Sequence, residues 1–227
     1  MRFLSPTLVL AVSFLVGPGC VRPKPVPQPT IQVQVSSEPG KAALFLAGRP
    51  IGETPCTLEV PSVDDLLTMT ATSSNEEVVE KRVRFLSQQQ AEVIFVFGTG
   101  HSTMAKALGF AKILVFDYGA GVTFAVNQAA LKPEFLPLLE RQAGLLKTHF
   151  PGLDIFVCGH TDAQGSPDFN LSLSLNRARS VSEDLAGRGI PLERMKVQGF
   201  GSQYPVAGND TDPGRAMNRR TELVLPQ

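Results

Sequence analysis

A hydroxyl, a carboxylate and a guanidinium lie close together in one polar part of the sequence. Thr161 and Asp162 follow the apolar run 154–158, and Arg177 comes fifteen residues after Asp162, on a segment with helical spacing. A carboxylate accepts hydrogen bonds from an ammonium group, and a guanidinium donates two parallel bonds to a carboxylate. Spacing alone leaves two arrangements open. In the first, Asp162 and Arg177 form a structural ion pair with each other. In the second, both face a cleft and bind a ligand that carries a positive and a negative charge.

Alternating strands and helices position these residues. From residue 113 onward, apolar spacing predicts strands at 122–126, 154–158, 196–200 and 221–225. Helices are expected over 133–150 and 170–187, the second with Asn170 as its N-cap. This pattern predicts an α+β fold, a two-layer α/β sandwich with helices laid on a mixed sheet.

Several separated blocks of this region resemble one family of peptidoglycan-binding domains. The blocks are Gly-His-Thr-Asp at 159–162, the helix segment 170–178, Gly-Phe-Gly at 199–201 and the run 214–220. Together they look like the domain shared by outer-membrane protein A (OmpA), the peptidoglycan-associated lipoproteins and the flagellar stator protein B. The resemblance covers about 113–227 and implies a domain that holds the cell-wall stem peptide.

In that family the matching Asp and Arg hold diaminopimelate, which implies this role for Asp162 and Arg177. The free end of meso-diaminopimelate is a zwitterion, so the carboxylate suits its ammonium and the guanidinium suits its carboxylate. The family also contacts the peptide at a Phe-Asp pair. Here the pair is Phe124 and Ala125, so only a backbone contact is expected at Ala125.

Three further residues complete the expected ligand contacts: Thr161, Asn170 and Arg219. Arg219 and Arg220 alternate at the start of the last strand, so one can reach the cleft while the other faces solvent. His160 is interpreted as a hydrogen-bonded residue that orients its loop. No second ligand lies near it at a metal spacing, and we expect no metal and no cofactor.

The segment 31–97 predicts a small all-β sandwich. Ile31, Val33 and Val35 alternate with polar residues, and turn signals follow at Pro39-Gly40 and 48–50. The turn motifs resemble the PEGA family of β modules, which implies an interaction or spacer module whose ligand is undefined. Residues 98–112 lack periodicity and predict a linker, and His101 stands where a phosphate loop needs lysine.

The first thirty residues predict export and anchoring. The apolar run 8–16 covers roughly 14 Å of the ~30 Å bilayer core, so residues 1–19 resemble a cleaved signal peptide and not a membrane span. Cys20 then matches the acylated cysteine of bacterial lipoproteins; the alternative is ordinary cleavage nearby. Residues 20–30 have proline at every second position from 23 to 29, which predicts a stiff tether.

Composition excludes several classes of protein. The 227 residues are 43% hydrophobic, with 21 basic and 21 acidic side chains, so the chain is neither wholly disordered nor a general nucleic-acid binder. Cys158 and His160 lack a positioned third group, so we predict no enzyme. Cys56 and Cys158 are expected to be packed thiols, with a disulfide between them as the alternative.

These observations predict a non-enzymatic lipoprotein of the outer membrane that faces the periplasm and tethers the membrane to the cell wall. Its expected partners are the diaminopimelate stem peptide, a membrane through the N-terminal lipid, and an envelope protein bound by the β module. The alternative function is a wall-positioned subunit of a secretion, motility or other envelope assembly, docked through the PEGA-like module.

Overall fold

The computed structural model describes residues 30–118, 124–125 and 127–227. The expected signal peptide, Cys20 and all of the tether except Thr30 lie outside the described residues. Of the strand expected at 122–126, only Phe124 and Ala125 are described, and Phe124 forms an isolated bridge with Leu131. Within the described ranges, no helix combines the length and the apolar character needed to cross a membrane.

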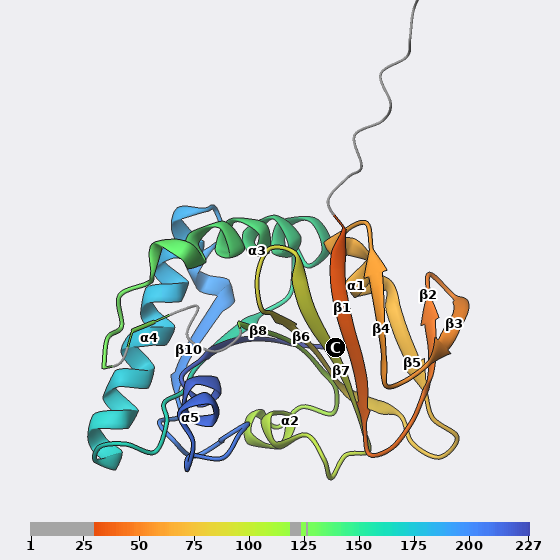
Figure 1. Cartoon of the computed structure of the whole chain (residues 1–227). Coiled ribbons are helices and arrows are strands. Elements are labelled where there is room, and N and C mark those ends of the chain that lie inside the picture. Colours follow the sequence, from red (N-terminus) through yellow and green to blue (C-terminus); the bar gives the residue numbers. More distant parts are fainter. Residues whose placement is uncertain (1–29, 119–123, 126) are drawn as a thin grey trace, which may run out of the picture.

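One eight-stranded mixed sheet runs through both halves of the chain (Figure 1). Its strand order is β10-β9-β11-β8-β6-β7-β1-β4. The strands are β1 (Ile31–Glu38), β4 (Cys56–Val60), β6 (Val78–Phe85), β7 (Gln90–Phe97), β8 (Ile113–Tyr118), β9 (Ile155–Gly159), β10 (Met195–Gly199) and β11 (Thr221–Pro226). A second sheet has the order β3-β2-β5 and consists of β2 (Ala43–Leu46), β3 (Arg49–Glu53) and β5 (Met69–Thr72).

Helices lie on both faces of the large sheet. They are α1 (Val63–Thr68), α2 (Thr103–Leu108), α3 (Leu136–His149), α4 (Pro167–Gly187) and α5 (Asp212–Asn218), with short 3-10 turns at Pro133–Phe135 and Leu192–Arg194. In Figure 1, α3 and α4 cover one face, and α2 and α5 lie on the other. The mixed α/β architecture expected for the C-terminal half is therefore confirmed. The all-β sandwich expected over 31–97 is present as strands in two sheets, together with the helix α1, which the sequence did not predict. The PEGA resemblance stays a prediction.

The N-terminus of α4 differs from the expectation. Ser166 is the N-cap, and its hydroxyl accepts a hydrogen bond from the Phe169 amide at 3.3 Å. Pro167 occupies the first helical position, where its fixed φ suits a helix and its missing N–H costs nothing. Asn170 is therefore not the cap. It lies inside the first turns and is buried, with 3% of its surface exposed.

Residues 98–112 are not the irregular linker that the sequence predicted. They contain α2, capped by Ser102, and carry the chain across β6, so that β7 and β8 lie on either side of that strand. β6 pairs antiparallel with β7 and parallel with β8. One apolar core then includes residues of both halves, such as Phe85 and Phe116. The predicted units are thus packed as one body.

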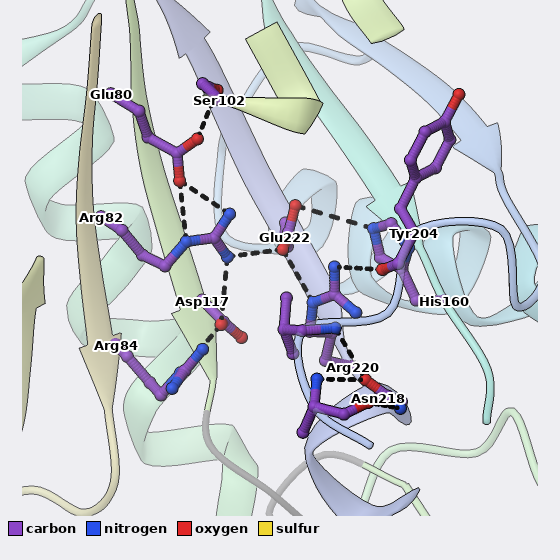
Figure 2. A network of polar contacts seen from close by, with 12 residues as sticks. Glu80, Arg82, Arg84, Ser102, Asp117, His160, Tyr204, Asn218, Arg220 and Glu222 are labelled. Carbon is purple, nitrogen blue, oxygen red and sulfur yellow. Dashed lines mark hydrogen bonds and ion pairs between the residues drawn. The ribbon is translucent and has the colours of Figure 1, made fainter. Parts of the chain in front are cut away.

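A cluster of buried charges crosses the place where the halves join. This charged seam consists of Glu80, Arg82, Arg84, Asp117, Arg220 and Glu222 (Figure 2). The Arg82 guanidinium pairs with Glu80 at 2.8 Å, Asp117 at 3.2 Å and Glu222 at 2.5 Å. Arg84 also pairs with Asp117, at 2.9 Å. These pairs join β6 to β8 and β11.

The seam satisfies charges that would be costly to bury alone. Glu222 is fully buried, and the positive charges of Arg220 and Arg82 hold its pKa well below the ordinary value, although burial alone would raise it. Three carboxylates likewise raise the pKa of Arg82 well above its usual range despite its burial. Removing one charged side chain would leave the opposite charges of its partners buried and unpaired in a medium of low polarity.

We therefore expect Arg82→Met to lower the free energy of unfolding by about 3–5 kcal/mol, because three carboxylates lose their shared cation. The matched control is Arg49→Met, which changes an exposed arginine of β3 and is expected to cost less than about 0.5 kcal/mol. Urea denaturation followed by circular dichroism measures both. Equal stability of the two variants would contradict the role assigned to the seam.

Candidate ligand-binding site

Two glycines at strand ends bring α4 against the sheet. A Cβ added to Gly159, at the end of β9, would lie 1.9 Å from the Ser174 carbonyl oxygen. A Cβ added to Gly199, at the end of β10, would lie 2.6 Å from the Leu175 amide nitrogen. The two positions require glycine for space. This close contact holds the next turn of α4, with Arg177, beside the chain that leaves β9.

The Arg177 guanidinium is buried and binds backbone carbonyls. Its Nε donates to the Gln128 oxygen at 2.9 Å, Nη1 to the His160 oxygen at 3.2 Å and Nη2 to the Ala125 oxygen at 3.3 Å. The cation also lies over the Phe124 ring, 5.1 Å from its centre. Within the described part of the chain, Arg177 forms no ion pair with a carboxylate. Of the five N–H donors of a guanidinium, three bond to these carbonyls.

Asp162 pairs with Arg219 and not with Arg177. Its Oδ2 accepts a hydrogen bond from Arg219 Nη1 at 2.7 Å, and its Oδ1 accepts one from the Gln164 amide at 3.1 Å. The structural ion pair between Asp162 and Arg177, one of the two arrangements that spacing left open, is therefore not formed. Arg219 lies just before β11, which places it opposite the end of β9.

The three charges nevertheless influence one another. Burial and the charge of Arg219 lower the pKa of Arg177 to about 10, and the charge of Asp162 acts in the opposite direction. Arg177 thus remains cationic at neutral pH. The site holds two guanidinium groups beside one carboxylate, and the buried guanidinium is the one without a carboxylate partner. A ligand carboxylate would supply the charge that balances it.

Thr161 and Asn170 also lie at this place. The Thr161 amide donates to the Gly201 oxygen at 2.9 Å, whereas its buried hydroxyl has no hydrogen-bond partner among the described residues. Asn170 packs beside Gly165 and Gly201. The structure therefore brings the expected residues into one neighbourhood, with Phe124 and Ala125 against Arg177.

His160 holds the backbone of the site. Its amide donates to the Arg220 oxygen at 2.9 Å, its carbonyl accepts from Arg177, and its ring stacks on Phe200 at 5.6 Å. Burial, followed by the charge of Arg220, lowers the pKa of His160. The ring lies 3.6 Å from Glu222, which connects the site to the charged seam. The hydrogen bonds of His160 are made by its backbone, whereas neither ring nitrogen has a hydrogen-bond partner among the described residues. The side chain is therefore held by packing and not by the hydrogen bond that the interpretation expected.

Sequence reasoning missed the role of two asparagines. The Asn218 side chain accepts hydrogen bonds from the Val206 and Ala207 amides at 2.8 and 3.1 Å and donates to the Asn209 side chain at 3.0 Å. Asn209 in turn accepts from the Ala163 amide at 3.0 Å. They fix the loop after β10 against the loop that carries Asp162. Asn218 lies in the motif block 214–220, whereas Asn209 lies outside the named blocks, and the bonds of both are non-local and have no sequence signal.

The two cysteines in the described part of the chain give no second site. Cys158 is buried and Cys56 is half-buried, and both are free thiols. Burial, together with the charge of Glu222, raises the pKa of Cys158 well above its ordinary value. The expectation of packed thiols is therefore confirmed, and the alternative disulfide does not form.

Comparison with known proteins identifies relatives of this region. Residues 123–219 match the family described as the OmpA family. The chain is 38% identical over 112 residues to the probable lipoprotein YiaD of Escherichia coli, which covers 49% of this chain and 51% of that protein. It is 30% identical over 128 residues to the peptidoglycan-associated lipoprotein of Brucella melitensis, covering 56% of this chain and 73% of that protein.

A third relative is the peptidoglycan-binding protein ArfA of Mycobacterium tuberculosis, 37% identical over 107 residues, 47% of this chain and 32% of that protein. Among solved structures, the peptidoglycan-associated lipoprotein from Burkholderia pseudomallei is 32% identical over 46% of this chain and 87% of that chain, with a TM-score of 0.43. The chain spans about half the length of the first relatives it matches, 51% and 57%.

The glycine contact gives a test of how the site is assembled. We expect Gly159→Ala to lower the free energy of unfolding by at least about 2 kcal/mol, because the added methyl group overlaps the Ser174 carbonyl of α4. Gly144→Ala is the control: its Cβ meets nothing within 4 Å, and it lies inside α3, where alanine gains about 0.5–1 kcal/mol over glycine. Thermal and urea unfolding distinguish the two, and similar effects would contradict the close contact.

The buried histidine predicts acid sensitivity. Because the folded pKa of His160 lies below its unfolded value, stability falls as pH drops below about 6.5. Glu222 has a folded pKa below its unfolded value and adds a second loss as pH drops below about 4.5. Unfolding free energies measured at pH 7.5, 5.5 and 4 should therefore decrease in that order.

Two histidine substitutions test whether His160 causes this pH dependence, one at His160 itself and one at an exposed histidine as the control. His160→Gln should reduce the loss between pH 7.5 and 5.5, whereas replacement of the exposed His101 by Gln should leave it unchanged. If both variants lose stability as the unmodified chain does, the acid sensitivity has another source.

Proposed function

The chain belongs to the OmpA family, and we propose that it binds peptidoglycan and catalyses no reaction. The observation that carries the proposal is the cationic side chain of Arg177, buried next to Asp162 and without a carboxylate partner in the described structure. Relatives named for peptidoglycan binding or association match 47% and 56% of the chain. A buried cation of this kind is costly unless a ligand or another group balances it.

The ligand we propose is the free zwitterionic end of diaminopimelate in the stem peptide. Two N–H donors of Arg177 are not used by the three carbonyls and are available to the ligand carboxylate. The Asp162 carboxylate retains acceptor positions for the ligand ammonium while it pairs with Arg219. The unpaired Thr161 hydroxyl supplies a further polar contact.

Binding has a structural requirement that follows from the burial of Arg177. Its side chain has 0% exposure, so a ligand must displace part of the segment that covers it. The Ala125 carbonyl, bound at 3.3 Å, is the longest of its three contacts. A backbone contact from Ala125 to the ligand competes with this bond. Because Ala125 also lacks a carboxylate, we expect each site to bind a single stem peptide weakly.

Membrane anchoring makes weak sites effective. In our proposal, residues 1–19 are removed, Cys20 carries lipid, and residues 20–30 hold the body away from an outer membrane. Anchoring raises the effective concentration of many copies near the wall, so the ensemble tethers strongly even when each contact is weak. The unit 31–97, proposed as PEGA-like, then lies between the anchor and the domain over 113–227 and is free to contact an envelope protein.

Co-sedimentation with purified sacculi tests the proposal. Residues 30–227 should pellet with sacculi that contain diaminopimelate, and free meso-diaminopimelate should compete. Asp162→Ala and Arg177→Ala should each weaken binding at least tenfold, because a charge-assisted hydrogen bond contributes about 1.5–3 kcal/mol. Sacculi that contain lysine in place of diaminopimelate should bind less.

Matched controls lie on α4, the helix that carries Arg177. Asp168→Ala and Arg179→Ala remove the same side-chain types from exposed positions of α4 and should leave pelleting unchanged. Circular dichroism establishes that each variant is folded. The proposal fails if folded Asp162→Ala and Arg177→Ala pellet as strongly as these controls.

A further inference from the structure

A cavity of about 250 Å³ lies away from Arg177, between the two halves of the chain. Leu67, Met69 and Phe95 line it from the N-terminal half, and Ile113 and Phe150 line it from the C-terminal half. Neither half encloses the space alone, so the cavity depends on the pairing of β6 with β8. Its wall is mostly apolar, as in small-molecule sites.

The size of the cavity limits what it can hold. At about 30 Å³ for each water-sized group, the volume accommodates roughly eight such groups. It is smaller than the pockets of about 300–1,000 Å³ that take drug-sized ligands. A short hydrocarbon body with one polar end fits these limits.

A lysine supplies the polar end of the cavity. Lys81 Nζ donates to the Leu67 oxygen at 2.7 Å and to the Met69 oxygen at 2.6 Å, and lies 5.7 Å from the centre of the Phe95 ring. An ammonium group has three donors, so one is left after these two bonds. The two carbonyls belong to the end of α1, which gives Lys81 a structural role as well.

A second lysine stands at the mouth without an opposite charge. Lys112 is exposed and lines the same cavity. Across residues 30–118, 124–125 and 127–227, neither Lys81 nor Lys112 forms an ion pair with a carboxylate. Burial, followed by the charge of Lys112, lowers the pKa of Lys81 to about 7. The two cations therefore repel each other, and a bound anion would remove this repulsion.

We propose that this cavity binds a small apolar carboxylate, with its carboxylate between Lys81 and Lys112 and its hydrocarbon body in the apolar space shared by both halves. The groups that face the Lys81 ammonium are the Leu67 and Met69 carbonyls, the Phe95 ring and Lys112. None of these four groups is acidic, and Gln227, which also lines the cavity, donates its amide N–H to the Lys112 oxygen at 3.0 Å. No ion pair neutralises either lysine among the described residues, so charge complementarity favours an anion. This inference does not depend on peptidoglycan binding.

Hexanoate is the probe, and hexanamide is its neutral counterpart of the same shape. Titrations of the purified chain, followed by the ring signals of Phe95 and Phe150, should show saturable hexanoate binding at least tenfold tighter than hexanamide binding. Because a bound anion favours the protonated form of Lys81, affinity should fall above about pH 7 by up to tenfold per pH unit. A lysine that only caps α1 would give no such dependence.

Substitutions separate binding from folding. Lys81→Met should abolish binding, but it also removes the bonds to α1. Lys112→Gln changes an exposed residue, so the fold should persist while affinity falls at least threefold. Lys196→Gln, an exposed lysine of β10 at the far edge of the sheet, is the matched control and should bind as the unmodified chain does. Equal binding of hexanoate and hexanamide, no saturation, or unchanged binding by Lys112→Gln would overturn the proposal.

Discussion

The Arg82 guanidinium binds three carboxylates at the place where the two halves of the large sheet meet, and much of the structure depends on this interaction. Glu80 belongs to its own strand, Asp117 to β8 and Glu222 to β11. The same Glu222 carboxylate accepts from Arg220 at 2.7 Å. Arg219 and Arg220 precede β11, whereas the sequence had predicted them as its first residues. Arg220 is buried in the seam, with 2% of its surface exposed, and does not face solvent, while the neighbouring Arg219 pairs with Asp162. The charged seam thereby helps to set the geometry of the ligand site.

The local elements were predictable because their signals are local. Alternation at 31–35, apolar spacing at 221–225 and helical spacing over 133–150 and 170–187 predicted elements that the structure contains within a few residues. Ser166 and Asn170 are both residue types that cap helices, and Pro167 at the first helical position decides in favour of Ser166.

Contacts between distant segments could not be predicted in this way. Arg82 and Arg84 alternate with apolar residues, which is typical of a strand with a solvated face, yet that face is buried against β8, β11 and the residues around α2. The expectation of an irregular linker at 98–112 was wrong for the same reason, since the pairing of β6 with β8 has no signal in either strand alone. The Asp162 partner was likewise found only when the fold placed Arg219 opposite β9.

The two proposed sites rest on a shared physical principle, a cation held in low-polarity surroundings without a carboxylate partner among the described residues. Arg177 is held by carbonyls and by the close contact of α4 with Gly159. Lys81 is held by carbonyls at the end of α1. In both places, bonds to the backbone fix the cation and leave donors for an anion, and the packing of elements far apart in sequence creates the space around it.

The most direct measurement of the central claim is an NMR titration of the chain with an uncrosslinked muropeptide that contains meso-diaminopimelate, observing the Arg177 Nε–H signal. If Arg177 binds the ligand carboxylate, this signal and the Thr161 amide signal shift and saturate together, and a muropeptide with lysine in place of diaminopimelate gives a smaller effect. Saturable binding that leaves the Arg177 and Thr161 signals unchanged would contradict it.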